Sequence, residues 1–411
     1  MKRGQLESNL LVLVTLALVA FGLVMVYSAT SATAAVGGGQ PITYLTRQGI
    51  YTAVGLGALL LLSRASYRAL RRLAPTLLAA SVVLLAGVLV LGDPVNGARR
   101  WLGAGPVTFQ PSELAKLTLV LWAAAQLSRR PAPRTLRELW RPLGAVFVVV
   151  CTLLVLEPDL GTTIAVGIAA GTLLLVSGSP VRLLARAGVL GAGLVVAAIW
   201  LEPYRRARIF GFLDPWDDAQ GAGFQSVQAM IGLGSGGLFG VGLGEGVQKV
   251  FYLPEAHTDM IFAIVGEEMG LIGSTAVILA YAAFAYAGLR IALLARDPFA
   301  KRLAAGLTVL VCGQAALNLA AVVGVAPLTG ITLPFVSYGG TSVIVSLASV
   351  GILLNIARSD GERATARVPD RGRGDRRPRA AGAGGGGGAD RPGCPGDLRR
   401  VGGPRRVAAR P

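Results

Sequence analysis

The sequence is poor in charge and in side chains that bind metals. Of its 411 residues only 15% are charged, whereas soluble domains carry roughly a quarter. It has one histidine and three widely separated cysteines, Cys151, Cys312 and Cys394. That spacing matches neither a zinc site nor a disulfide framework. These absences argue against a water-soluble domain and against a zinc enzyme.

Long apolar runs are what the chain has instead. Hydrophobic residues make up 53% of it, and its mean hydropathy is +0.61. A membrane-spanning helix needs about 20 mostly apolar residues. We therefore expect an all-α polytopic membrane protein with about ten transmembrane helices. The candidate spans are roughly 9–28, 46–62, 73–91, 112–128, 143–156, 160–177, 183–200, 259–292, 303–323 and 341–357.

The first run is followed by Ala32-Thr-Ala34, the kind of site at which a secretory signal is cleaved. Because many spans follow, we expect an uncleaved signal-anchor helix.

Positive charge is concentrated in the loops on one side of these spans, near 64–72, 129–141, 182–186 and 290–302. The positive-inside rule places that side, and both termini, in the cytoplasm. The connection 201–258, between spans seven and eight, then becomes a large extracellular loop. Loops of this length are usually functional or disordered, and its aromatic residues and glutamines predict an ordered, functional one.

The end of the chain differs in composition. Residues 358–411 are rich in Arg, Gly, Pro and Ala, so we expect a disordered cytoplasmic tail. Its positive charge favours anionic lipid as its partner. It has no nucleic-acid-binding motif, and we expect no nucleic-acid partner.

Ionisable residues crowd the start of the eighth span. Glu255, His257 and Asp259 lie at its mouth, and Glu267 and Glu268 lie within it. Charged groups at membrane depth are expensive and are functional candidates by default. If the helix begins at Asp259, then Asp259 and Glu267 lie loosely on one side of it. A purely structural role for Glu267 and Glu268, through partners on other spans, is the alternative.

Some cations lie in the outer loops, although the positive-inside rule concentrates Lys and Arg on the cytoplasmic side. Arg100, beside Trp101, and Arg208 belong to two such loops. They favour an anionic ligand at the outer face, with pairing to local carboxylates an equally good explanation. In the long loop we also single out Gln225 as a substrate-binding candidate.

Two further charged motifs begin predicted spans. Glu113 and Lys116 are spaced i,i+3, which allows them to pair on one helix face. Lys116 is either part of that structural pair or a phosphate contact. Asp159, in a tight turn, is favoured as a helix N-cap, a role compatible with substrate binding.

The segment 324–340 is apolar but rich in helix breakers. It contains Pro327, Pro334, Gly339 and Gly340, which forbid a regular helix. Non-helical backbone at membrane depth must line a cavity or be buried in protein. We expect a re-entrant outer loop that walls a cavity, with Ser337 among the substrate-binding candidates.

Six motifs occur in order along residues 10–357: Arg-Trp-Leu, Gln-Pro-Ser-Glu-Leu-Ala-Lys, Glu-Pro-Asp-Leu-Gly-Thr, Phe-Leu-Asp-Pro, Leu-Pro-Glu-Ala-His-Thr-Asp and Leu-Pro-Phe-Val-Ser-Tyr-Gly-Gly. This set resembles the SEDS family, the FtsW/RodA peptidoglycan polymerases. The motif around His257 and the Gly266-Glu-Glu stretch resemble the division branch of that family more than the elongation branch.

The resemblance implies a ten-span domain over 1–357 that polymerises lipid II into glycan strands at the outer face of the bacterial cytoplasmic membrane. It implies Asp259 as the catalytic residue. It also implies a class B penicillin-binding protein as transpeptidase partner, beside other division proteins at the septum. A lipid II flippase and an elongation-type polymerase are the alternatives.

The residues fit that chemistry. Asp259 is our candidate general base, and His257 is a candidate to orient it or to pack beside it. Arg208, Arg100, Lys116 or a bound divalent cation, Mg²⁺ or Mn²⁺, are the candidates to stabilise the leaving pyrophosphate.

Overall fold

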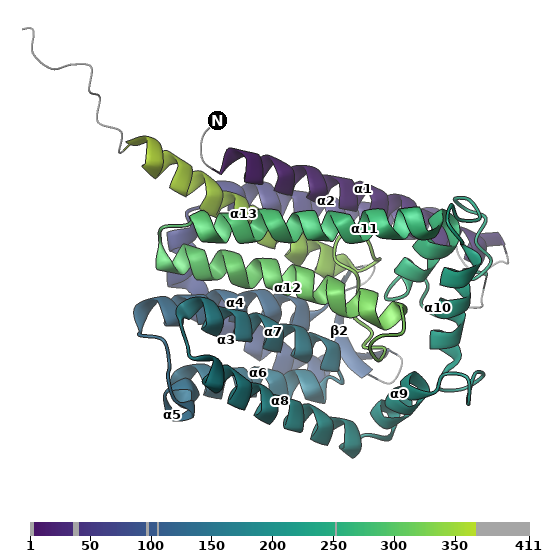
Figure 1. Cartoon of the computed structure of the whole chain (residues 1–411), viewed down its shortest axis with the longest axis horizontal. Helices are drawn as coiled ribbons and strands as arrows, with labels where there is room; N and C mark the ends of the chain where they lie inside the picture. Colours follow the sequence, from purple (N-terminus) through teal and green to yellow (C-terminus); the bar gives the residue numbers. More distant parts are fainter. Residues whose placement is uncertain (1–3, 36–40, 96–97, 105–106, 251–252, 367–411) are drawn as a thin grey trace, which may run out of the picture. The chain divides into compact units, whose positions relative to one another are not determined.

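The computed structural model describes residues 4–35, 41–95, 98–104, 107–250 and 253–366. They are helical almost throughout (Figure 1). The helices are α1 Gln5–Ala35, α2 Pro41–Arg64, α3 Tyr67–Leu91, α4 Pro111–Arg129, α5 Leu136–Leu139, the π-helix η1 Trp140–Gly144, α6 Ala145–Leu156, α7 Leu160–Ser177, α8 Val181–Leu201, α9 Pro203–Leu213, α10 Phe224–Ser235, α11 Ile261–Leu294, α12 Pro298–Val322 and α13 Gly340–Ala366. The predicted class, an all-α polytopic membrane protein, is confirmed.

Nine membrane-spanning candidates occur among the described residues, with α5, η1 and α6 counted as one. The remaining predicted span, 112–128, coincides with α4, which falls short of the others in apolar composition. Most residues of α4 are buried, and it packs against α3, α7 and α12. A helix shielded from lipid in this way does not need an apolar surface all round, so α4 accommodates Glu113 and Lys116.

The two described ends of the chain lie at the same end of the bundle (Figure 1). A Cβ atom built on Gly4 would lie 3.8 Å from the Ala357 carbonyl oxygen, so the start of α1 meets α13. The opposite end carries the connections 92–110, 157–159, 202–260 and 323–339. We call it the loop-rich end.

A small sheet at the loop-rich end joins α3 to α4. Its antiparallel strands are β1 Asp93–Val95, β2 Ala98–Ala104 and β3 Val107–Phe109, with Trp101 opposite Asp93 and Leu102 opposite Phe109. The all-α prediction did not include these strands. Their backbone groups bond to one another where the chain leaves the helices, which satisfies donors and acceptors that the bundle cannot.

The predicted outer loop 201–258 is not simply a loop, because it contains α9 and α10. Helix α10 packs against α11 and, more lightly, against α9 and α12. The expectation of an ordered segment therefore holds for its described part.

Helix α11 differs from its prediction at both its start and its middle. It begins at Ile261, two residues later than predicted, so Asp259 precedes the helix. The prediction that Asp259 and Glu267 share one side of this helix is therefore wrong. Within the helix, Gly270 departs from helical backbone, with φ 63° and ψ −158°. Segment 237–242 satisfies the backbone groups freed there: Val241 and Gly242 donate to the Glu267 and Glu268 carbonyls, and Leu271 and Ile272 donate to the Gly237 and Leu238 carbonyls.

Helix α13 continues to Ala366, past the predicted domain end at 357. The first residues of the predicted tail, 358–366, are therefore helical. The rest of that prediction lies outside the described residues.

Candidate active site

Asp259 lies half-buried in the turn that leads into α11. Its Oδ1 accepts a hydrogen bond from the Thr258 hydroxyl at 3.2 Å, and its carbonyl accepts one from Asn318 Nδ2 at 2.7 Å. Burial raises the pKa of Asp259 to about 6, against the lowering effect of Arg208. At neutral pH the carboxylate is therefore mostly ionised and able to accept a proton, as a general base must.

Arg208, on α9, faces the same small space as Asp259. Its Nη2 donates to the Tyr204 hydroxyl at 2.6 Å and its Nη1 donates to the Leu328 carbonyl at 3.2 Å. A Cβ atom built on Gly330 would lie 3.7 Å from Arg208 Nη1 and 3.9 Å from Asp259 Oδ2. The absence of a side chain at Gly330 thus leaves room between a proton acceptor and a fixed positive charge.

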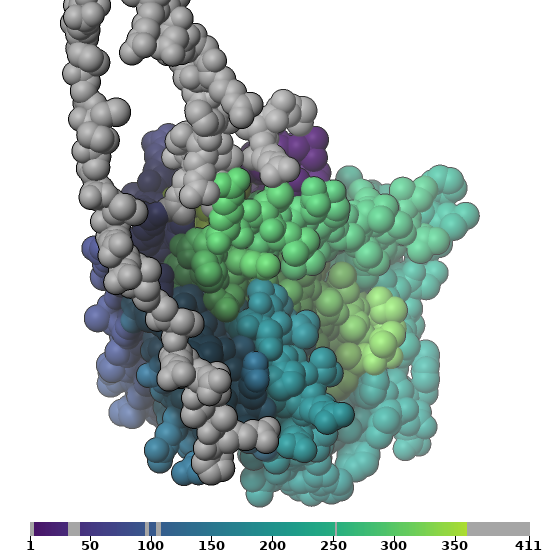
Figure 2. Space-filling view, turned by 60° about the vertical axis from the view of Figure 1, so that its left-hand side comes forward, coloured from purple at the N-terminus to yellow at the C-terminus, as the bar shows by residue number. Residues whose placement is uncertain are grey.

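Segment 323–339 forms one wall of this space. It is non-helical, as predicted, and in Figure 2 its light green surface lies beside the teal of the 201–260 region. Gln314 and Asn318, one turn apart on α12, anchor it by donating to the Thr332 carbonyl at 3.0 Å and the Ile331 carbonyl at 2.8 Å. Since Asn318 also binds the Asp259 carbonyl, the wall and the carboxylate are positioned by one side chain.

Ser337 has a structural contact inside this wall. Its buried hydroxyl accepts the Leu333 N–H at 2.8 Å and so fixes the turn 333–337. The structure does not bring it to Asp259.

His257 packs between two tyrosine rings. Its ring lies 5.3 Å from that of Tyr44 and 5.4 Å from that of Tyr338, and its carbonyl accepts the Tyr338 N–H at 2.9 Å. Burial lowers the pKa of His257 despite the opposing charge of Glu255, so the imidazole is neutral at pH 7. These contacts make His257 a support of the 255–259 turn.

Two of the three predicted pyrophosphate cations are engaged elsewhere. Arg100 donates to the Glu157 and Pro158 carbonyls at 2.8 and 2.5 Å. These two residues directly follow the end of α6. Lys116 is buried and donates to Glu113 at 2.8 Å, the predicted i,i+3 pair, and to Gln314 at 2.7 Å. Of the three, Arg208 is the one that the structure brings to Asp259.

Three other candidates occupy the loop-rich end without meeting Asp259. Trp101 is half-buried on β2. Gln225 Nε2 donates to the Pro254 carbonyl at 3.3 Å, tying α10 to the turn before His257. Asp159 Oδ1 accepts the Thr162 N–H at 3.0 Å, which confirms the predicted N-cap of α7.

Glu267 and Glu268 both have structural partners. Glu267 accepts the backbone N–H groups of Val247 and Gln248 at 2.7 and 3.2 Å. Glu268 pairs with Lys249 at 2.6 Å and accepts the Ser28 hydroxyl at 2.7 Å. The acids therefore pin the end of the long connection to α11 and α1, as the structural alternative expects.

Sequence reasoning missed two residues that contact Asp259 and one buried carboxylate elsewhere at the loop-rich end. Thr258 and Asn318 contact Asp259, and the one available signal was an asparagine within an apolar span. Glu157 is fully buried, and neither of its carboxylate oxygens has a hydrogen-bond partner among the described residues. Burial and the neighbouring Asp159 raise its pKa to about 8, against the effect of Arg100.

The described side chains around Asp259 do not form an all-protein site for a resident metal ion. Within the described ranges no three His, Cys, Asp or Glu side chains converge in a way that could hold one. We therefore derive no step through Mg²⁺ or Mn²⁺.

The fold and the site define a class: a polytopic helical membrane protein that presents a carboxylate and a guanidinium to one space at one end of its bundle. The family model described as "Cell cycle protein", which covers FtsW, RodA and SpoVE, matches residues 8–362. The chain belongs to this family.

Named relatives agree with that membership. The chain is 39% identical over 350 residues to a probable peptidoglycan glycosyltransferase FtsW of Geobacter sulfurreducens, covering 84% of this chain and 94% of the relative. It is 39% identical over 358 residues to stage V sporulation protein E of Bacillus subtilis, covering 85% and 96%.

Solved structures are similar over the same region. A structure of a peptidoglycan synthase complex that coordinates polymerization and crosslinking contains a chain 34% identical, with a TM-score of 0.72, covering 85% of this chain and 97% of that one. The rod shape determining protein RodA of Thermus thermophilus is 31% identical with a TM-score of 0.63, covering 85% and 96%.

Proposed function

We propose that this protein is a peptidoglycan glycosyltransferase that polymerises lipid II into glycan strands during cell division. The observation that carries the proposal is the shared space above Gly330, which Asp259 and Arg208 both face. Family membership and the relatives named as glycosyltransferases support the substrate class. The name FtsW, which several relatives share, supports the division branch over the elongation branch.

Asp259 acts as the general base. The 4-hydroxyl of the acceptor sugar gives its proton to the carboxylate while its oxygen attacks the anomeric carbon of the growing chain. The bond from that carbon to the lipid pyrophosphate breaks on the opposite side, so the configuration inverts. A positioned base contributes typically 10²–10⁴-fold, and the Arg208 guanidinium stabilises the negative charge that builds on the pyrophosphate.

The chain crosses the bacterial cytoplasmic membrane ten times, with α4 as the tenth crossing. The meeting of Gly4 with Ala357 supports an even number of crossings, because both described ends lie at one end of the bundle. The cation-rich connections lie at that end, so it faces the cytoplasm and the loop-rich end faces outward. This orientation supports a site on the outer face of the membrane, and the division branch of the family supports its use at the septum.

The partner is a class B penicillin-binding protein, which supplies the transpeptidase. The similarity to a chain from a complex that coordinates polymerization and crosslinking supports this partner. Other division proteins complete the assembly.

The test is glycan synthesis from labelled lipid II by the purified full chain with its transpeptidase partner. Asp259→Asn lowers the rate of polymerisation roughly 10²-fold or more. Asp217→Asn, an exposed change in the same connection, leaves that rate unchanged. Near-normal polymer from folded Asp259→Asn contradicts the assignment. Movement of lipid II across the bilayer by a wild-type chain that makes no polymer indicates a flippase instead.

A further inference from the structure

A cavity lies at the end of the bundle opposite the loop-rich end, between the last turn of α4 and the segment that leads through α5 into η1. Its volume is about 310 Å³. Apolar side chains form most of its wall: Leu127, Pro131, Pro133, Leu139, Pro142 and Leu143. The polar residues that line it are Gln126, Arg130, Glu138 and Arg141. The cavity therefore has a mostly apolar wall and polar or charged residues at its rim.

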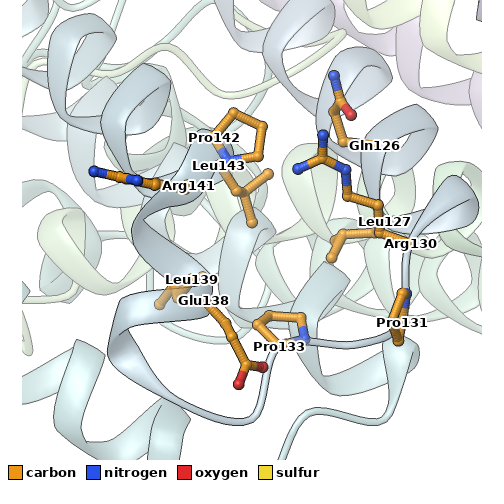
Figure 3. Close-up of a pocket in the computed structure, with 10 residues that line it drawn as sticks. All are labelled: Gln126, Leu127, Arg130, Pro131, Pro133, Glu138, Leu139, Arg141, Pro142 and Leu143. Carbon is orange, nitrogen blue, oxygen red and sulfur yellow. The ribbon is translucent and has the colours of Figure 1, made fainter.

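Two of the polar side chains lie next to each other at one edge of the cavity. In Figure 3 the guanidinium of Arg130 and the amide of Gln126 lie on the same side of it, whereas Arg141 points away. No described residue pairs with Arg130. A cation and an amide therefore remain available at the rim.

The one acid at the rim is engaged in a local turn. Glu138 accepts the Arg134 N–H at 2.9 Å, and its own N–H bonds to the Thr135 hydroxyl at 3.3 Å. These two bonds hold Glu138 in the turn. The segment 129–141 otherwise carries five arginines, Arg129, Arg130, Arg134, Arg137 and Arg141, so the surroundings favour an anion.

We propose that this cavity binds an anionic phospholipid, with the phosphate on Arg130 and Gln126 and the start of an acyl chain against the leucines and prolines. The site stands at the end of a membrane-spanning bundle, where headgroup and acyl chain meet. Basic pockets between transmembrane helices bind anionic lipid headgroups in this way. The apolar wall separates this site from general attraction of a basic loop to the membrane, which needs no cavity.

Native mass spectrometry of the full chain in detergent, with added phosphatidylglycerol or phosphatidylcholine, tests the proposal. The wild-type chain retains phosphatidylglycerol in preference to phosphatidylcholine. Arg130→Gln weakens that retention about fivefold, the effect of one cation near an anionic headgroup. Arg137→Gln removes the same charge from an exposed position that does not line the cavity, and it retains the lipid.

A second variant tests the wall without changing the charge. Leu143→Ser weakens retention of phosphatidylglycerol although every arginine remains. Equal losses in Arg130→Gln and Arg137→Gln, or equal retention of the two lipids, overturn the proposal. The lipid readout does not use lipid II, so it stands or falls separately from the proposed polymerase activity.

Discussion

The carboxylates of Glu268 and Asp259 lie on the same stretch of chain but are used differently. Glu268 is buried inside the bundle and bonded by Lys249 and Ser28. Among the described residues, Asp259, at the loop-rich end, receives one side-chain hydrogen bond, from Thr258, and it faces a space that it shares with Arg208. A carboxylate whose oxygens already accept hydrogen bonds from protein donors serves to hold helices together. One with capacity to spare is able to take a proton from a substrate.

The largest expected effect comes from breaking the buried ion pair between Lys249 and Glu268. Lys249→Met leaves the buried Glu268 charge without its counterion, and such a change costs about 3–5 kcal/mol. The double variant Lys249→Met with Glu268→Leu regains most of this, because no buried charge remains. Thermal unfolding in detergent measures both, with exposed Lys301→Met as the control. Equal losses in the single and double variants contradict a buried ion pair.

The next effect comes from filling the open space. Gly330 has φ +70° and Gly324 has φ +79°, so alanine at either position costs about 1–2 kcal/mol of backbone strain. At Gly330 the added methyl group also stands between Arg208 and Asp259, whereas the nearest atom at Gly324 is the sulfur of Met230, at 3.7 Å. We expect Gly330→Ala to lower glycan polymerisation roughly 10²-fold, as for a displacement of about 1 Å in an active site.

Gly324→Ala is the matched control for that substitution. It carries the same strain in the same segment, and we expect it to leave polymerisation near normal. If the two variants lose activity equally, the strain rather than the shared space is responsible.

A smaller effect concerns pH. Asp259 acts when ionised, so the wild-type rate falls as pH decreases through about 6, its pKa. Arg208 favours the ionised form, and Arg208→Gln therefore raises the pKa further and moves the acid limb of the rate profile to higher pH. Arg208→Lys keeps the charge and moves it less. Polymerisation rates across pH 5 to 8 measure the shift. An acid limb that stays in place in Arg208→Gln contradicts the coupling.

Local parts of this architecture were predictable because their causes lie close in sequence. Apolar runs mark the spans, Asp159 caps the helix that follows it, and Glu113 pairs with Lys116 one turn later. The α9 and α10 helices and the small sheet were not predicted, because short elements outside the membrane carry no long apolar run.

The contacts that assemble the site were beyond reach for a physical reason. Asn318 reaches the Asp259 carbonyl across 59 positions, and Arg208 reaches Leu328 across 120. No spacing rule connects residues on different helices, so the sequence offered three cations where the structure brings one to Asp259. The catalytic assignment itself came from the motif resemblance.

Glu157 extends the comparison to a carboxylate that is buried but has no hydrogen-bond partner among the described residues. Burial, chiefly, raises its pKa to about 8 from the ordinary value of 4.5 that the unfolded chain has. The folded protein thus holds this proton more tightly than the unfolded chain does. Its contribution to stability is fully present below pH 4.5 and is lost as pH rises through about 8.

Glu157→Gln keeps the shape of the side chain and removes its titration. Its stability should therefore fall less than that of the wild type between pH 5 and 9, with Glu202→Gln, an exposed change at the same end, following the wild type. Apparent unfolding temperatures in detergent across that range measure the difference. A Glu157→Gln curve parallel to the wild type would mean that the carboxylate is ionised and paired in the folded protein. It would then belong with Glu268 rather than with Asp259.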